Sequence, residues 1–134
     1  MIGETNLTVL LGAMEPVLGE ETYVFCNVKR IDEKMDLDRI WALVREDEAM
    51  TLILEKATAD NADLPYESLF SRITLNIHSS LDAVGLTAAV ATKLSAYGIS
   101  ANVVAAYYHD HIFIQQEKSI QALAALQELI EENN

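Results

Sequence analysis

Cysteine is almost absent from this chain of 134 residues, which carries Cys26 alone. A single thiol cannot form an internal disulfide, so the sequence fits a reducing compartment. Cys26 stands in the segment Tyr23–Val28, whose β-branched and aromatic residues predict a strand. We therefore expect Cys26 to be a buried structural thiol rather than a reactive one.

Basic residues are also scarce. Nine Lys and Arg stand against 21 Asp and Glu, which gives a formal net charge of −12 at pH 7. No run of Lys or Arg offsets this charge locally, and the phosphate backbone of a nucleic acid would be repelled. The composition therefore argues against nucleic acid as a partner.

Long hydrophobic runs are missing as well. No apolar stretch approaches the roughly 20 residues that a membrane-spanning helix needs. No Lys or Arg precedes Lys29, so the amino terminus lacks the positively charged region of a signal peptide. We expect a soluble, cytoplasmic protein that does not associate with a membrane.

Common enzyme motifs are missing too. The sequence has no phosphate-binding Gly-x-x-x-x-Gly-Lys loop and no dinucleotide fingerprint. Ser79 and Ser80 follow His78, but no Gly-x-Ser-x-Gly turn accompanies them, and serines before a helix ordinarily cap it. We therefore expect no catalytic residues, no enzyme activity and no cofactor.

The histidines raise the question of a metal site. His109 and His111 are two residues apart, and on one strand such side chains share a face. Imidazole is a good zinc ligand, but no cysteine or fixed third ligand lies nearby in the sequence. If a hairpin turns at His109–Asp110, the two rings need not converge. Packing at a turn or sheet edge is favoured over contact with a ligand or partner, and metal binding comes last.

The first half of the chain, residues 1–64, predicts a small set of short elements. Apolar residues at helical spacing indicate a helix that ends near Pro16, and two β-rich segments indicate strands. The expected elements are a helix over 6–14, a strand over 23–28, a helix over 37–44 with Trp41 in the core, and a strand over 50–55. The polar run 60–63, closed by Pro65, predicts a linker to the second half.

The second half, residues 65–134, has clearer periodicity. Ile73, Leu75 and Ile77 alternate with polar residues, as in a half-buried strand. A loop over 79–85 and an amphipathic helix that stops at Gly98 follow. The remaining elements are strands over 99–108 and 111–116, joined at His109–Asp110, and a final helix with Ile120, Leu123, Leu126 and Ile130 on its apolar stripe.

This order, β-α-β-β-α, is most of a ferredoxin-like α/β (α+β) sandwich, with an antiparallel sheet and helices on one face. One further strand is needed to complete the usual four. The first half offers two strands, which would either extend the same sheet or build a degenerate second copy. The latter would make the chain a tandem pseudo-dimer of related halves.

Several stretches resemble the ACT-domain family. Residues 73–86 are similar to the start of an ACT domain, where a strand ends, a loop carries an acidic residue three positions before a glycine, and a helix opens. Here those two residues are Asp82 and Gly85. Residues 98–102 resemble the passage from that helix to the second strand. The segments 23–26, 78–89 and 102–113 resemble a small group of stand-alone bacterial ACT proteins of unassigned function.

The resemblance implies a regulatory protein that binds an amino acid or similar small metabolite where ACT domains meet. The expected ligand-binding residues are His78, Ser79, Ser80, Asp82, Ala83, Val84, Gly85, Leu86 and Asn102. The unpaired N–H groups of a helix amino terminus suit a carboxylate, and Gly85 lets the backbone approach it. Asp82 or Asn102 would take the amine, although capping the helix is the simpler role for Asp82.

The same resemblance implies self-association, because ACT sheets join edge to edge or bury a helix face. Better-known ACT sensors are attached to an enzyme or a DNA-binding domain, and the sequence shows neither. The alternative function is a ligand-free assembly module, whose sheet edges dock onto a larger protein.

Overall fold

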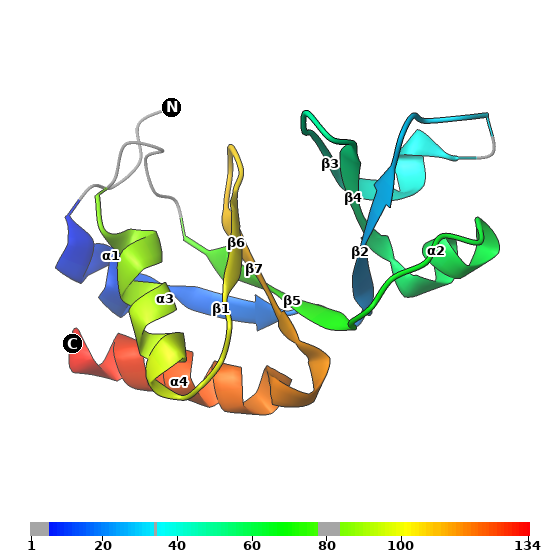
Figure 1. The fold of residues 1–134 in the computed structure, drawn as a ribbon. Coiled ribbons are helices and arrows are strands. Elements are labelled where there is room, and N and C mark those ends of the chain that lie inside the picture. Colours follow the sequence, from blue (N-terminus) through cyan, green and yellow to red (C-terminus); the bar gives the residue numbers. More distant parts are fainter. Residues whose placement is uncertain (1–5, 34, 78–83) are drawn as a thin grey trace. The chain divides into compact units, whose positions relative to one another are not determined.

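The computed structural model describes residues 6–33, 35–77 and 84–134, which form two compact units. Residues 21–70 make up unit 2, and residues 1–20 join residues 71–134 in unit 1 (Figure 1). The sequence predicted a division between residues 64 and 65. The structure instead groups the first 20 residues with the second half of the chain.

Unit 1 combines a four-stranded sheet with three α-helices among its described residues (Figure 1). Its elements are α1 (Leu7–Ala13), β1 (Glu15–Leu18), β5 (Phe70–Asn76), α3 (Leu86–Ala96), β6 (Asn102–Ala105), β7 (Asp110–Gln115), the 3₁₀ turn η2 (Gln116–Lys118) and α4 (Ser119–Glu132). The strands lie in the order β1-β5-β7-β6. The predicted β-α-β-β-α order of the second half is therefore confirmed.

Strand β1 is the fourth strand that the second half lacked. It pairs antiparallel with β5, from Glu15 opposite Asn76 to Leu18 opposite Ile73. Pro16 was expected to end the first helix, but α1 ends at Ala13 and Pro16 lies within β1. A proline is tolerated on an edge strand, since its missing N–H can face away from the ladder. The pairing explains why unit 1 begins at the amino terminus.

The core of unit 1 lies between the sheet and its helices. β5 contributes Ile73 and Leu75, which are 0% and 1% exposed, as their alternation predicted. Core residues from the other elements are Leu10, Leu86, Val90, Leu94, Ile112, Ile114, Ala122, Ala125 and Leu126. The predicted stripe of the last helix was wrong at Ile120, which is 75% exposed, because α4 buries its alanine-lined face instead.

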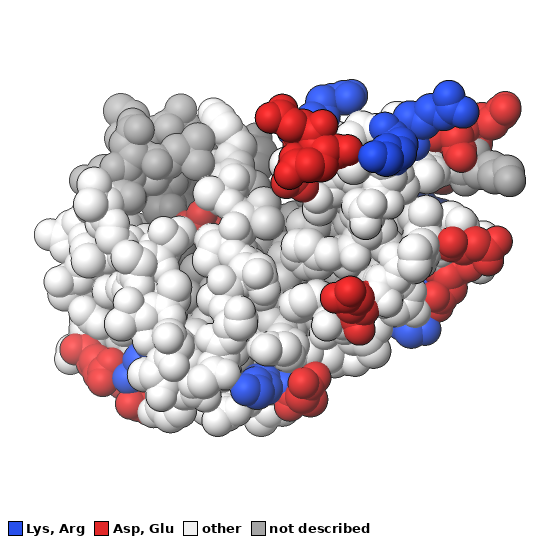
Figure 2. Space-filling view, viewed as in Figure 1, with Lys and Arg blue, Asp and Glu red and all other residues white. Residues whose placement is uncertain are grey.

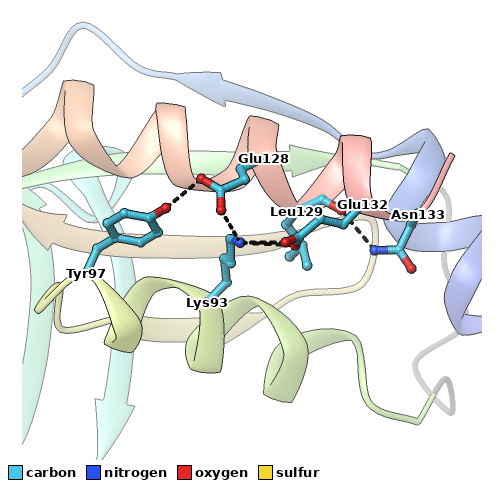
Figure 3. Close-up of polar contacts among 6 residues, drawn as sticks. All are labelled: Lys93, Tyr97, Glu128, Leu129, Glu132 and Asn133. Atoms are coloured by element: carbon cyan, nitrogen blue, oxygen red, sulfur yellow. Dashed lines mark hydrogen bonds and ion pairs between the residues drawn. The ribbon is translucent and has the colours of Figure 1, made fainter.

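A polar network joins α3 to α4 at the edge of this core (Figure 3). The ammonium of Lys93, on α3, lies 2.8 Å from Glu128 Oε1 and 3.0 Å from Glu132 Oε1, both on α4. The hydroxyl of Tyr97 donates to the second oxygen of Glu128 at 2.5 Å. These contacts raise the pKa of Lys93 and lower the pKa of Glu128.

The described residues of unit 2 form a three-stranded antiparallel sheet in the order β3-β4-β2, with one short α-helix. Its elements are β2 (Tyr23–Val28), the 3₁₀ turn η1 (Leu37–Arg39), β3 (Ile40–Arg45), β4 (Met50–Glu55) and α2 (Lys56–Asn61). The strands predicted over 23–28 and 50–55 are confirmed. Cys26 is buried with Val24, Leu52 and Leu54, and burial raises the pKa of its thiol.

Two predictions for the first half were wrong. The segment 37–44 is not a helix: after the single turn η1 it becomes β3, because pairing with β4 outweighs the weak helical spacing. The run 60–63 is not a plain linker either. Asp60 lies in the last turn of α2 and accepts hydrogen bonds from Lys56 at 2.8 Å and from Tyr66 at 2.7 Å.

The hairpin between β6 and β7 turns earlier than predicted. The N–H of Ala106 donates to the carbonyl of His109 at 3.1 Å, so the two-residue connection is Tyr107–Tyr108. β6 accordingly ends at Ala105, and Asp110 already pairs with it in β7.

The end of α4 lies directly against α1, which gives a test of the packing. A Cβ added at Gly12 would lie 2.8 Å from the carbonyl oxygen of Asn133. Gly to Ala within a helix usually stabilises by about 0.5–1 kcal/mol, but here we expect Gly12→Ala to lower the free energy of unfolding by about 1–3 kcal/mol. Urea denaturation measures this. Deleting Asn133 and Asn134 should make the same substitution neutral or stabilising, and an equal loss in both backgrounds would contradict the contact.

The Lys93 network predicts a stability contribution with two pH limits. Because the folded-state pKa of Glu128 is lowered, its contribution is present above the unfolded pKa and is lost as pH falls through the folded value. Because the pKa of Lys93 is raised, its contribution is lost as pH rises through the folded value. Lys93→Met should therefore lower Tm most near neutral pH and low salt. Lys29→Met, whose ammonium lies 3.5 Å from the main-chain oxygen of Glu48, is the control.

Candidate functional site

The predicted ligand-binding loop joins β5 to α3. Five of its residues, His78, Ser79, Ser80, Asp82 and Ala83, lie outside the residues that the structure describes. The remaining predicted site residues are placed: Val84, Gly85 and Leu86 at the start of α3, and Asn102 at the start of β6.

Gly85 is the N-cap of α3 and has a left-handed backbone, with φ of +95°. Side chains rarely adopt this conformation, and a Cβ here would also lie 3.1 Å from Leu7 Cδ2. Within the described part of the chain, no side chain caps the helix. The first helical bond, from Ala89 N to Gly85 O at 2.9 Å, leaves the N–H groups of residues 86–88 outside the ladder.

The surroundings of this helix end differ on its two sides. The side chain of Leu86 is 3% exposed and anchors the first turn in the core of unit 1. The side chain of Val84, just before the N-cap, is 84% exposed. Packing of Leu86 thus fixes the start of α3, while Val84 beside it is exposed. Such a helix end can accept the carboxylate of a small molecule.

Asn102 does not join Gly85 within unit 1. It follows the carboxyl end of α3, whereas Gly85 stands at the amino end, and the 11 residues of α3 extend about 16 Å. The amide of Asn102 donates to the carbonyl of Phe113, its partner across the hairpin, at 3.1 Å. The structure therefore separates Asn102 from the loop with which the sequence grouped it.

The tip of the β6–β7 hairpin lies at the same end of the sheet as the amino end of α3 (Figure 1). β7 starts beside the end of β5, since His111 Nδ1 and Thr74 Oγ1 lie 3.0 Å apart. Tyr107 and Tyr108 form this tip, and both are exposed, at 67% and 68%, with ring centroids 5.0 Å apart. Their place at the tip depends on the position of the turn, which the sequence did not reveal.

The two histidines of this hairpin are side by side but form no metal site in the described residues. Their ring centroids are 6.3 Å apart, and no group of three His, Cys, Asp or Glu with metal-binding geometry occurs in residues 6–33, 35–77 and 84–134. His111 instead contacts Thr74 on the neighbouring strand. His111 therefore packs inside the sheet rather than at its edge, because β7 lies between β5 and β6.

Burial controls the electrostatics of the hairpin. It lowers the pKa of His111 from 6.5 to about 4, and the positive charge of Arg72 and the neighbouring His109 act in the same direction. Burial also raises the pKa of the Asp110 carboxyl, which the charge of His109 partly offsets. His111 is therefore neutral in the folded protein at neutral pH.

The comparison with protein families identifies the fold that holds this loop. Two family models, each described as an ACT domain, match residues 2–71 and 71–128 in tandem. The chain belongs to the ACT-domain family. No curated protein matches it.

Solved structures show the same fold. A Vibrio cholerae protein of unknown function, described as a possible transport protein, is 52% identical over 92% of this chain and 95% of its own, with a TM-score of 0.83. An Agrobacterium tumefaciens protein is 16% identical over 87% of this chain and 89% of its own, with a TM-score of 0.71. The regulatory subunit of aspartate kinase from Thermus thermophilus is 12% identical over 85% of this chain and 95% of its own, with a TM-score of 0.59.

The predicted ferredoxin-like fold, with two ACT-like halves in tandem, is thus confirmed. The ACT match points in general to regulatory binding of small molecules. In the described residues of this ACT protein, no helix has the length and apolar character needed to cross a membrane.

The neutral state of His111 predicts a pH dependence. Because its folded-state pKa is below the ordinary value of 6.5, the unfolded state takes up the proton first. The free energy of unfolding should therefore decline as pH falls from about 6.5 to about 4. In NMR titrations, one imidazole C–H resonance should have a midpoint near pH 4 and be missing from His111→Gln. A midpoint near 6.5 for the His111 resonance would contradict its burial.

Proposed function

We propose that this ACT-domain protein is a regulatory protein without enzyme activity, which binds an amino acid or similar small metabolite at the β5–α3 loop. The observation that carries the proposal is the amino end of α3. Gly85 holds a left-handed backbone there beside exposed Val84, and no described side chain caps the N–H groups of the first turn. Main-chain N–H groups at Val84, Gly85 and Leu86 would hold the ligand's carboxylate.

The rest of the ligand would meet the other predicted loop residues. Asp82 would pair with the amine, and His78, Ser79, Ser80 and Ala83 would line the remainder of the site. Asn102 lies on β6, which ends the strand order of unit 1. It would contribute only where a second copy of the chain supplies it, so the complete site would form in a homo-oligomer.

One observation favours the alternative, a ligand-free assembly module. Two tyrosines at the hairpin tip are exposed and stacked edge to face, and tyrosine is enriched in protein interfaces. In the view of Figure 2, the surface over the β6–β7 hairpin and α3 is largely uncharged. A protein partner docked on this surface would need no metabolite.

Thermal unfolding against a panel of the twenty amino acids and related metabolites separates the two functions. A ligand that binds only the folded state stabilises it by about 2.7 kcal/mol at 100 times its Kd, which raises Tm by roughly 5–10 °C in a protein of this size. Gly85→Trp should abolish the shift in a variant that still folds. Gly98→Ala is the matched control, because Gly98 also has positive φ, at +71°, but lies outside the loop.

Two outcomes would contradict the proposal. A panel that leaves Tm unchanged, together with a stable oligomer in light scattering, would support the assembly module. A shift that survives Gly85→Trp would move the binding site away from the β5–α3 loop.

A further inference from the structure

Unit 2 contains a cavity of about 360 Å³ of its own. None of its lining residues belongs to the β5–α3 loop. They are Met35, Asp36, Arg39, Ile40, Leu52, Leu54, Ala57, Thr58, Asn61, Ala62 and Leu64. The cavity therefore lies between η1, the sheet of unit 2 and one face of α2.

The cavity has a structural origin that a comparison of the two units makes clear. In unit 1, the connection from β5 to β6 contains the 11-residue helix α3, which covers the sheet with Leu86, Val90 and Leu94. In unit 2, the corresponding connection from β2 to β3 contains only the three-residue turn η1 among its described residues. The described residues of this connection thus place no helix over the sheet of unit 2, and a cavity lies beside α2.

The floor of the cavity is apolar. Leu52 and Leu54 of β4 are 0% and 2% exposed, and Ile40 of β3 lies beside them. On the α2 side, Ala57 and the C-cap residue Ala62 line the cavity with small side chains, together with the polar Thr58 and Asn61. An aliphatic group fits these walls, because burying it removes apolar area from water at about 25 cal/mol per Å².

The mouth of the cavity carries one positive and one negative charge. Arg39 Nε lies 3.8 Å from Asp36 Oδ2, and the two side chains are 69% and 60% exposed. The other oxygen of Asp36 accepts from the N–H of Asp38 at 3.0 Å, which fixes the carboxylate at the start of η1. A solvent-exposed ion pair of this length contributes little to stability, so a ligand can separate its members at small cost.

These features together define a ligand class. Binding pockets for small molecules usually measure about 300–1,000 Å³, are mostly apolar and carry a few polar groups that orient the ligand. We propose that unit 2 holds a second small-molecule site, which binds an α-amino acid with an aliphatic side chain. Its carboxylate pairs with Arg39, its ammonium group pairs with Asp36, and its side chain enters the cavity over Leu52 and Leu54. The proposal does not depend on the β5–α3 loop, and either site can exist without the other.

Isothermal titration calorimetry on the full chain tests the site with L-valine, L-leucine, L-isoleucine and L-methionine as probes. At least one should bind. For that probe, the analogues without the amine or without the carboxylate should bind at least about tenfold more weakly, since each loses one charge-assisted contact. No heat with any of the four probes, or equal affinity for an analogue, overturns the proposal.

Variants locate the binding. Ala57→Phe fills the cavity from an exposed position on α2 and should abolish the heat of binding, whereas Ala96→Phe, an exposed alanine on α3, should not. Arg39→Met should weaken binding about tenfold or more, and the matched control Arg30→Met should not. Circular dichroism confirms that each variant folds.

The two proposed sites are distinguished by Gly85→Trp. Binding that survives Gly85→Trp but not Ala57→Phe places the amino acid in unit 2. Binding that survives Ala57→Phe but not Gly85→Trp overturns the second site and supports the loop instead.

Discussion

The pairing of β1 with β5 is the constraint on which the rest of the structure depends. Four residues at the amino terminus complete the sheet of unit 1, and the antiparallel register places Leu18 opposite Ile73 across 55 positions of sequence. Residues 21–70 are left between these two strands and form their own sheet and core. A continuous stretch therefore builds one ACT unit, while the other is assembled from both ends of the chain.

Local patterns predicted much of this fold, and long-range pairing explains what they missed. The strands at 23–28 and 50–55 and the alternation of Ile73 and Leu75 follow from side-chain type and period alone. The segment 37–44 and the strand at Pro16 depend on partners far away in sequence, β4 and β5. A single sequence contains no signal for such pairing. The segment 37–44 was therefore predicted to be a helix, and Pro16 was predicted to end one.

In the candidate sites, too, local features could be predicted from the sequence, whereas features that depend on distant residues could not. Gly85 at the start of a helix could be predicted, because glycine is accepted at the N-cap and an apolar stripe follows it in the sequence. The separation of Asn102 from Gly85 depends on the length and direction of α3. The cavity of unit 2 lies where the described residues between β2 and β3 form only η1, and such a short connection has no motif in the sequence. The cavity can be recognised only once the fold shows that β4, η1 and α2 lie next to one another.

The contact between Gly12 and the last residues of the chain has a consequence for biosynthesis. The amide of Asn134 donates to the carbonyl of Gly12 at 3.0 Å, so unit 1 joins the first and last helices of the described chain. A ribosome completes residues 21–70 before most of β5 and all of β7 and α4 exist. Unit 2 can therefore form its local hairpin early, while β1 waits for β5 and α1 waits for α4.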